Sequence, residues 1–199
     1  MKKKLFVFYG PKGSGKDTCV ELLKEAGTNI GQFSFAHSLK KTVWELFKTK
    51  IKNKDRIFGA IDMKEKPIKG WTIPDNVKQM CGFTEDVWTG RRLLQWFGTD
   101  ICRNIHGSIW ADQLVESLYE HGHCFHYIAV SDCRFNNEYE ALKKVKEFKV
   151  IFVKILRNTG DNEFSDHASE IDMKDFQEDL VIKNDGTLEE LKAELLKLI

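Results

Sequence analysis

The sequence lacks a dominant charge, a long apolar run and any closely spaced pair of cysteines. Its 31 basic and 30 acidic residues leave a formal net charge of +1, so no overall field favours nucleic acid or a membrane surface. Apolar runs such as LFVFY, residues 5–9, are much too short to span a bilayer. The five cysteines form no C-x-x-C pair and are odd in number, which indicates free thiols in a reducing compartment. We therefore expect a cytoplasmic protein, in the host cytoplasm if the source is viral, with neither nucleic acid nor membrane as its partner.

The length of 199 residues suits one domain, residues 1–199, with a sizeable hydrophobic core. The first ten residues, MKKKLFVFYG, have the basic start and apolar run of a signal peptide. That run is too short for a signal peptide and leads directly into a Gly-rich turn, so we interpret it as a first strand.

Buried-strand patterns alternate with helical patterns along most of the chain. Strands are expected at residues 4–9, 31–35, 127–130, 149–156 and 180–182. Helices are expected at residues 16–26, 36–50, 90–105, 109–122, 137–148 and 187–199, the last with a Thr187-x-x-Glu190 capping box. Residues 50–89 hold two of the three prolines and show the least regular pattern. The alternation predicts a parallel sheet of five strands that helices cover on both faces.

A Gly-rich stretch, GPKGSGKDT at residues 10–18, joins the first predicted strand to the first predicted helix. Glycines such as Gly13 and Gly15 let backbone amides approach phosphate oxygens, and the helix N-terminus favours negative charge. Lys16 adds a positive charge for the β- and γ-phosphates of a nucleotide. In this context we predict a phosphate-binding loop rather than a turn without a ligand, and an α/β, three-layer fold of the P-loop NTPase type.

The residue after Lys16 is Asp17, where such loops normally carry Ser or Thr, and the hydroxyl follows at Thr18. A carboxylate in a first helical turn is favoured by the helix dipole alone. Beside a triphosphate it would be repulsive without a cation, so we expect Asp17 to help hold Mg²⁺, directly or through water. Thr18 would bind a phosphate or a Mg²⁺-bound water. The G-K-x-T spacing resembles nucleoside monophosphate kinases.

Two further segments fall where a sheet of this type places its ligands, beyond the carboxyl ends of strands. VSDCRFNNE, residues 130–138, carries Asp132, Arg134 and Glu138, and RRLLQWFGTD, residues 91–100, carries Arg91 and Gly98. Arginine suits bidentate phosphate contacts, so this set beside a phosphate loop predicts an acceptor-phosphate site. Asp132 has a second interpretation, capping of the helix that follows it, and the two remain open.

Four blocks together resemble the phage-type deoxynucleoside monophosphate kinases. They are GPKGSGKDT, RRLLQWFGTD with Trp110 downstream, SDCRFNNE, and the C-terminal DHASEI with LVIKNDGTLEEL. The first block is shared with phosphomevalonate kinases, whereas the second and the last are more specific. The resemblance covers most of the chain apart from residues 50–89.

The resemblance implies a P-loop kinase that moves the γ-phosphoryl group of ATP, with Mg²⁺, onto a deoxynucleoside 5′-monophosphate. It also implies a helical acceptor-binding insertion at about residues 36–110. The residues implied to contact ATP are Gly13, Ser14, Gly15, Lys16, Asp17, Thr18, Asn184, Gly186 and Thr187, with Asp17 and Thr18 also at the metal. Those implied to contact the monophosphate or the centre of transfer are Lys12, Lys40, Arg91, Gly98, Trp110, Asp132, Arg134 and Glu138.

An acceptor phosphate is already an anionic nucleophile, so catalysis should consist of positioning and charge neutralisation. The predicted catalytic residues are Lys16, Arg91, Asp132 and Arg134. Transfer to water must be suppressed, and the polar segment 157–172 is either a closing lid or a plain connection. Two alternatives remain: another P-loop small-molecule kinase, for phosphomevalonate or dephospho-coenzyme A, and a nucleotide-binding module that transfers nothing. The accepted bases, the discrimination against ribose and the presence of a homodimer stay open.

Overall fold

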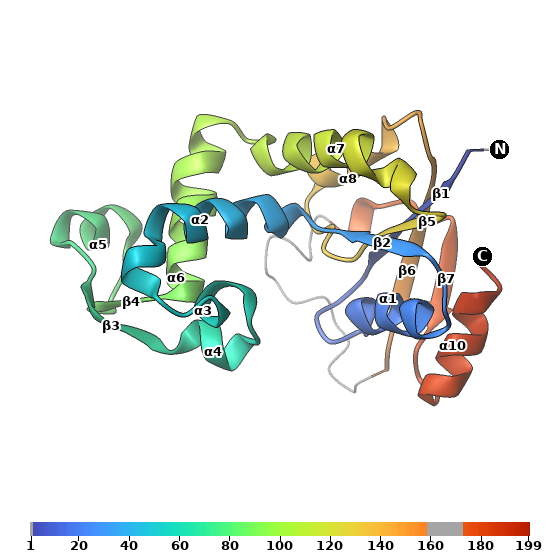
Figure 1. The fold of residues 1–199 in the computed structure, drawn as a ribbon, viewed down its shortest axis with the longest axis horizontal. Coiled ribbons are helices and arrows are strands. Elements are labelled where there is room, and N and C mark those ends of the chain that lie inside the picture. The colour runs from blue at the N-terminus through green and yellow to red at the C-terminus, as the bar shows by residue number, and fades with distance from the viewer. Residues whose placement is uncertain (1, 159–172) are drawn as a thin grey trace. The chain divides into compact units, whose positions relative to one another are not determined.

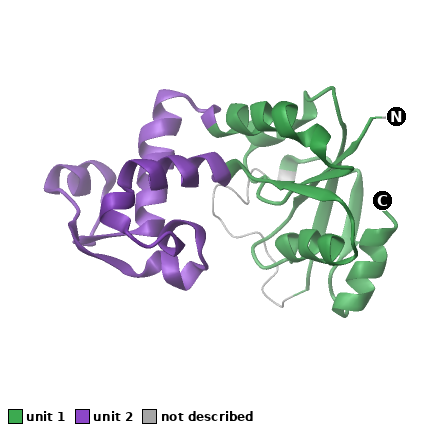
Figure 2. Cartoon of the chain, viewed as in Figure 1, with its two compact units in different colours: residues 1–35, 110–199 green, residues 36–109 purple. Residues whose placement is uncertain are grey.

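The computed structural model describes residues 2–158 and 173–199, and the chain divides into two compact units (Figure 2). We call residues 1–35 and 110–199 the sheet unit, and residues 36–109 the inserted unit. The segment 157–172, the predicted lid, lies outside the described residues apart from 157 and 158. Within the described part of the chain, no helix has both the length and the apolar content needed to cross a bilayer.

The sheet unit contains the predicted parallel sheet of five strands (Figure 1). The strands are β1 (Lys4–Tyr9), β2 (Ile30–Phe33), β5 (Tyr127–Val130), β6 (Lys149–Leu156) and β7 (Leu180–Lys183). They lie in the order β2-β5-β1-β6-β7, and every neighbouring pair is parallel. β1 is central, and its residues 5–9 are fully buried, as the continuous apolar run predicts. The phosphate-loop segment therefore begins at the middle of the sheet.

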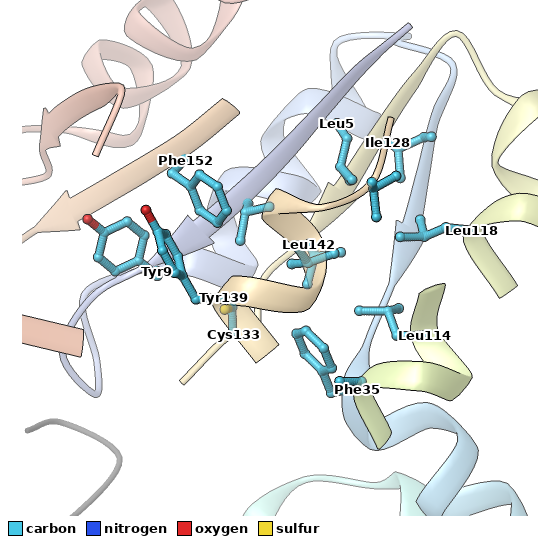
Figure 3. Close-up of a cluster of buried hydrophobic side chains, with 14 of the residues drawn as sticks. Leu5, Tyr9, Phe35, Leu114, Leu118, Ile128, Cys133, Tyr139, Leu142 and Phe152 are labelled. Carbon is cyan, nitrogen blue, oxygen red and sulfur yellow. The ribbon is translucent and has the colours of Figure 1, made fainter. Parts of the chain in front are cut away.

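Successive side chains of β1 point to opposite faces of the sheet and so divide the core in two. Leu5, Val7 and Tyr9 pack with residues of α7 (Ile109–His121) and α8 (Asn136–Lys143), as Figure 3 shows for Leu114, Leu118, Tyr139 and Leu142. Phe6 and Phe8 pack on the other face with residues of α1 (Lys16–Glu25) and α10 (Leu188–Leu196). The two helical layers and the sheet between them form the predicted three-layer P-loop fold.

The ends of these helices follow local sequence signals. Gly27, with φ of 78°, ends α1, and the predicted Thr187–Glu190 capping box opens α10. α8 ends at Lys143, earlier than the helical pattern to residue 148 predicts. The reason is that the chain turns there and buries Val145 and Phe148 in the core. The elements η2 (Gly122–Cys124) and η3 (Met173–Asp175) are short 3₁₀ helices.

The inserted unit consists of one long helix, several short helices and a two-stranded antiparallel sheet. Its elements are α2 (Phe35–Ile51, which starts at the last residue of the sheet unit), α3 (Asp55–Phe58), α4 (Ile61–Glu65), β3 (Pro67–Thr72), α5 (Asp75–Cys81), β4 (Val87–Thr89), α6 (Gly90–Gln95) and the π-helix η1 (Trp96–Arg103). The pairing of β3 with β4 was not predicted, because elements of three to seven residues are too short to show a period. The single helix expected at residues 90–105 is an α-helix continued by a π-helix. The hydrophobic core of the inserted unit includes Val43, Ile57, Ile68, Trp88 and Leu93.

Candidate functional site

The loop between β1 and α1 has the conformation that its glycines allow. Gly13 and Gly15 have φ of 80° and 97°, in the left-handed region that favours glycine. A Cβ atom at Gly15 would lie 2.4 Å from Asn184 Nδ2, and one at Gly10 would lie 2.2 Å from the Ile155 carbonyl oxygen. A Cβ at Gly13 would meet nothing within 4 Å. Glycine is thus required at position 13 by backbone conformation, and at positions 10 and 15 by close neighbours as well.

The side chain of Lys16 is buried and folds back over this loop. Its Nζ donates hydrogen bonds to the carbonyl oxygens of Gly10 (2.9 Å) and Pro11 (2.7 Å), and lies 3.4 Å from Ser14 Oγ. The ammonium group therefore lies within the Gly-rich loop, among the backbone groups that are predicted to surround phosphate. Lys12, in the same loop, is exposed.

Asp17 is joined to the end of a neighbouring strand. Ser131, which directly follows β5, donates a hydrogen bond from its Oγ to Asp17 Oδ1 at 2.6 Å. This length is typical of a hydroxyl bonded to an ionised carboxylate. Thr18 adds a hydroxyl in the same helical turn. Mg²⁺ prefers carboxylate and hydroxyl oxygens, so the donors at Asp17 and Thr18 are of the type that fits this ion.

Asn184 links the end of β7 to the phosphate loop. Its Nδ2 donates to the Ser14 carbonyl oxygen at 2.9 Å, and its backbone N–H donates to the Leu156 carbonyl oxygen. A cavity of about 380 Å³ next to it is lined by residues that include Asn184, Gly186 and Thr187. The structure thus brings together two segments that were assigned to ATP, the Gly-rich loop and the turn after β7.

Two acidic residues after β5 bind backbone groups at the starts of two different helices. Asp132 accepts hydrogen bonds from Ser34 Oγ (2.7 Å) and from the backbone N–H of Phe35 (3.1 Å), at the start of α2. Glu138 is buried and accepts from the N–H groups of Arg134 (2.9 Å) and Phe135 (3.2 Å), so it caps α8. One interpretation of Asp132 was that it caps the helix after it. In the structure, Glu138 caps that helix, α8. The side chain of Arg134 is exposed, and Trp110 is buried at the start of α7.

Arg91 lies in the inserted unit and forms an ion pair there. Its Nη1 is 2.9 Å from Glu65 Oε1, and both side chains are more than half exposed. The pair borders a cavity of about 690 Å³ that Arg92 and Gln95 also line, together with the acidic residues Glu85 and Asp86. This volume lies within the range of small-molecule sites, which is about 300–1,000 Å³.

Lys64 adds a third cation to Arg91 and Lys40. It is half-buried on α4, and its pKa is lowered by burial and then by the positive charges of Lys40 on α2 and Arg91 on α6. Three helices therefore place like charges near one another, which favours a bound anion. Lys40 and Arg91 were predicted from the sequence but Lys64 was not, because the local sequence MKEK, residues 63–66, is typical of a solvated helix face. The predicted Gly98 lies in η1, where a Cβ would come 2.6 Å from Leu39 Cδ2.

The predicted site residues are thus divided between the units. Lys16, Asp132 and Arg134 belong to the sheet unit, whereas Lys40 and Arg91 belong to the inserted unit.

Comparison with known proteins gives consistent matches. A family model described as deoxynucleotide monophosphate kinase matches residues 60–195. A protein of that name from Escherichia phage RB69 is 31% identical over 116 residues, which cover 57% of this chain and 46% of the relative. Another of that name, from Enterobacteria phage T4, is 29% identical over 144 residues, which cover 65% of this chain and 58% of the relative. The chain therefore spans about half the length of the curated relatives it matches. The solved structure of TT1252 from Thermus thermophilus aligns over 100% of both chains at 15% identity with a TM-score of 0.50, a similarity of fold alone.

Proposed function

The chain belongs to the deoxynucleotide monophosphate kinase family, and on this premise we propose that it transfers the γ-phosphoryl group of ATP to a deoxynucleoside 5′-monophosphate. The observation that carries the proposal is the presence of two separate cationic arrangements. One is Lys16 within the Gly-rich loop, and the other is Arg91 with Lys40 and Lys64. A kinase that acts on a phosphate needs one anion site for its donor and another for its acceptor. A module that only binds a nucleotide does not require the second anion site.

The donor side of the proposal rests on the Gly-rich loop. The amides from Gly13 to Thr18 and the Lys16 ammonium would bind the β- and γ-phosphates, and Asn184, Gly186 and Thr187 would border the adenine. Mg²⁺, which Asp17 and Thr18 would hold, neutralises charge between these phosphates. To reach a phosphate, Lys16 exchanges its hydrogen bonds to Gly10 and Pro11 for phosphate oxygens.

The acceptor side rests on the charge around Arg91. In the structure, Glu65 forms an ion pair with the Arg91 guanidinium. An ion pair exposed to this degree contributes only about 0–1 kcal/mol to stability. A dianionic phosphate can therefore replace Glu65 and make bidentate contacts with Arg91. Lys64 interacts electrostatically with both Arg91 and Lys40, so Lys40 and Lys64 add positive charge to that of Arg91.

The chemical step requires only that the protein holds the two substrates in position and neutralises their charge. The acceptor oxygen is anionic before the reaction, so no side chain has to remove a proton from it. Lys16, Arg91 and the exposed Arg134 would offset the charge of the transferring group, and removal of such an arginine costs roughly three to five orders of magnitude in rate. Asp132 anchors the segment that leads into α2, and we assign it a supporting role at the site.

A coupled assay of ADP release tests the proposal. Purified protein with ATP and Mg²⁺ is offered dAMP, dGMP, dCMP, dTMP and their ribose forms, with mevalonate phosphate and dephospho-coenzyme A as competing acceptors. We expect acceptor-dependent ADP release with at least one deoxynucleotide, and its loss in Lys16→Ala but not in Lys146→Ala, which alters an exposed lysine of the sheet unit. ADP release that is independent of any acceptor, or a preference for one of the two competing acceptors, would refute the assignment.

A further inference from the structure

The hydrogen bond between Ser131 and Asp17 connects two residues that are 114 positions apart, and Ser131 has no role in the proposed reaction as described above. Ser131 is only 5% exposed, whereas Asp17 is exposed. We propose that Ser131 is a positioning residue for the metal site, whose hydroxyl holds the Asp17 carboxylate in place to receive Mg²⁺. The inference deepens the proposed function, because it rests on the binding of Mg²⁺-ATP at the Gly-rich loop.

The positions of the two residues support this role. In other P-loop proteins, a loop hydroxyl directly after the lysine and a carboxylate supplied by a strand together hold Mg²⁺. Here the residue after Lys16 carries the carboxylate, and the residue at the strand end carries the hydroxyl. The strand is β5, which pairs directly with β1, and Val130 lies opposite Val7 in the register. The structure thus contains the same two functional groups at these two positions, with their places exchanged.

The neighbouring Asp132 does not replace Ser131 in this arrangement. Its two carboxylate oxygens accept hydrogen bonds from Ser34 and Phe35, at the start of α2. The group from the end of β5 that bonds the loop carboxylate is the Ser131 hydroxyl. With one oxygen of Asp17 bonded to a buried donor, the rotation of the carboxylate is restricted. Such outer partners of metal ligands typically contribute 10–100-fold to metal affinity.

The first test measures binding rather than turnover. The affinity for the non-hydrolysable analogue AMPPNP is determined by isothermal titration calorimetry, with Mg²⁺ and again with EDTA. Ser131→Ala is expected to weaken binding about 10-fold with Mg²⁺, while binding in EDTA stays unchanged. Ser131→Thr, which keeps the hydroxyl, is expected to retain the Mg²⁺-dependent affinity. Ser117→Ala on α7 is the matched control for loss of a hydroxyl in the sheet unit.

An exchange of the two side chains gives the sharper test. Asp17→Ser removes the carboxylate, and Ser131→Asp alone places two carboxylates within hydrogen-bonding distance, so each single variant should bind Mg²⁺-AMPPNP poorly. The double variant has one carboxylate and one hydroxyl again, and we expect it to bind at least about 10-fold more tightly than either single variant. Circular dichroism establishes that each variant is folded.

Two results would overturn the inference. One is a loss in Ser131→Ala that is equal with and without Mg²⁺. The other is a double variant that shows only the sum of the two single losses. The two proposals can fail separately. If Ser131→Ala loses Mg²⁺-dependent affinity for AMPPNP but the wild-type protein phosphorylates no deoxynucleotide, the proposed function is refuted and this inference stands. An active kinase whose Ser131→Ala variant keeps its Mg²⁺-dependent affinity would refute this inference alone.

Discussion

Substitution of Gly15 by alanine should destabilise the protein through two separable effects. The first is backbone strain, because φ at this position is 97°. The second is a collision, because the new Cβ would lie 2.4 Å from Asn184 Nδ2, which donates to the Ser14 carbonyl oxygen. Asn184 is buried, so its side chain has little room to move aside without losing this hydrogen bond.

The size of each effect follows from the structure. A non-glycine residue in the left-handed region costs about 1–2 kcal/mol. A buried carbonyl that loses its hydrogen-bond partner adds about 1–3 kcal/mol. We therefore expect Gly15→Ala to lower the free energy of unfolding by about 2–5 kcal/mol. Gly13→Ala is the matched control, because Gly13 has φ of 80° and open space around its Cβ position. It should cost only the strain, about 1–2 kcal/mol.

Urea unfolding without nucleotide, followed by far-UV circular dichroism, measures both variants. The decisive comparison repeats each substitution in an Asn184→Ala background, where the collision is absent. There, the excess cost of Gly15→Ala over Gly13→Ala should disappear, in a double-mutant cycle that isolates the contact. If the two glycine variants cost the same in the wild-type background, or if their difference survives the removal of Asn184, the reasoning is wrong.

Three further predictions concern the proposed reaction. Arg134→Ala should lower turnover by about three orders of magnitude and leave the calorimetric affinity for AMPPNP intact; near-normal turnover would remove Arg134 from the site. Glu65→Gln should lower the acceptor KM by up to about fivefold, because the exposed pair with Arg91 is worth at most about 1 kcal/mol, and a raised KM in steady-state kinetics would contradict this. The acceptor KM should rise as pH is raised through the pKa of Lys64, which burial and two neighbouring cations hold below the usual lysine range, since phosphate binds the protonated amine. Lys64→Arg should abolish this rise, because a guanidinium stays charged, and identical pH profiles for the two proteins would count against the role of Lys64.

Local signals in the sequence were enough to predict the sheet unit. The run of residues 5–9 indicates a buried strand because all its side chains are apolar, and the structure places it at the centre of the sheet. The glycines of the loop, the lysine after them and the helix that follows are consecutive in the chain, so their spacing alone predicts a phosphate loop. The capping box at Thr187 is confirmed for the same reason, since its partner is three residues away.

The inserted unit was less predictable from sequence. β3 and β4 each need the other strand to satisfy their backbone groups, and neither carries a recognisable pattern alone. Glu138 was expected at the substrate, and this stays a prediction; the structure places it, buried, at the start of α8, where it accepts backbone hydrogen bonds. From sequence, a carboxylate in a first helical turn does not reveal whether it faces a ligand or its own helix.

The five strands of the parallel sheet, the glycine loop with its lysine, and the membership of a kinase family could be inferred from the amino-acid sequence, because each depends on residues that are near neighbours or on recognisable blocks. Contacts between distant residues could be seen only in the folded chain: Ser131 bonds Asp17 across 114 positions, Asn184 bonds Ser14 across 170, and Lys64 lies near Lys40 and Arg91. The physical reason is that hydrogen bonds and charge interactions act over a few ångströms in space. Which distant residues come within that range depends on the packing of strands and helices.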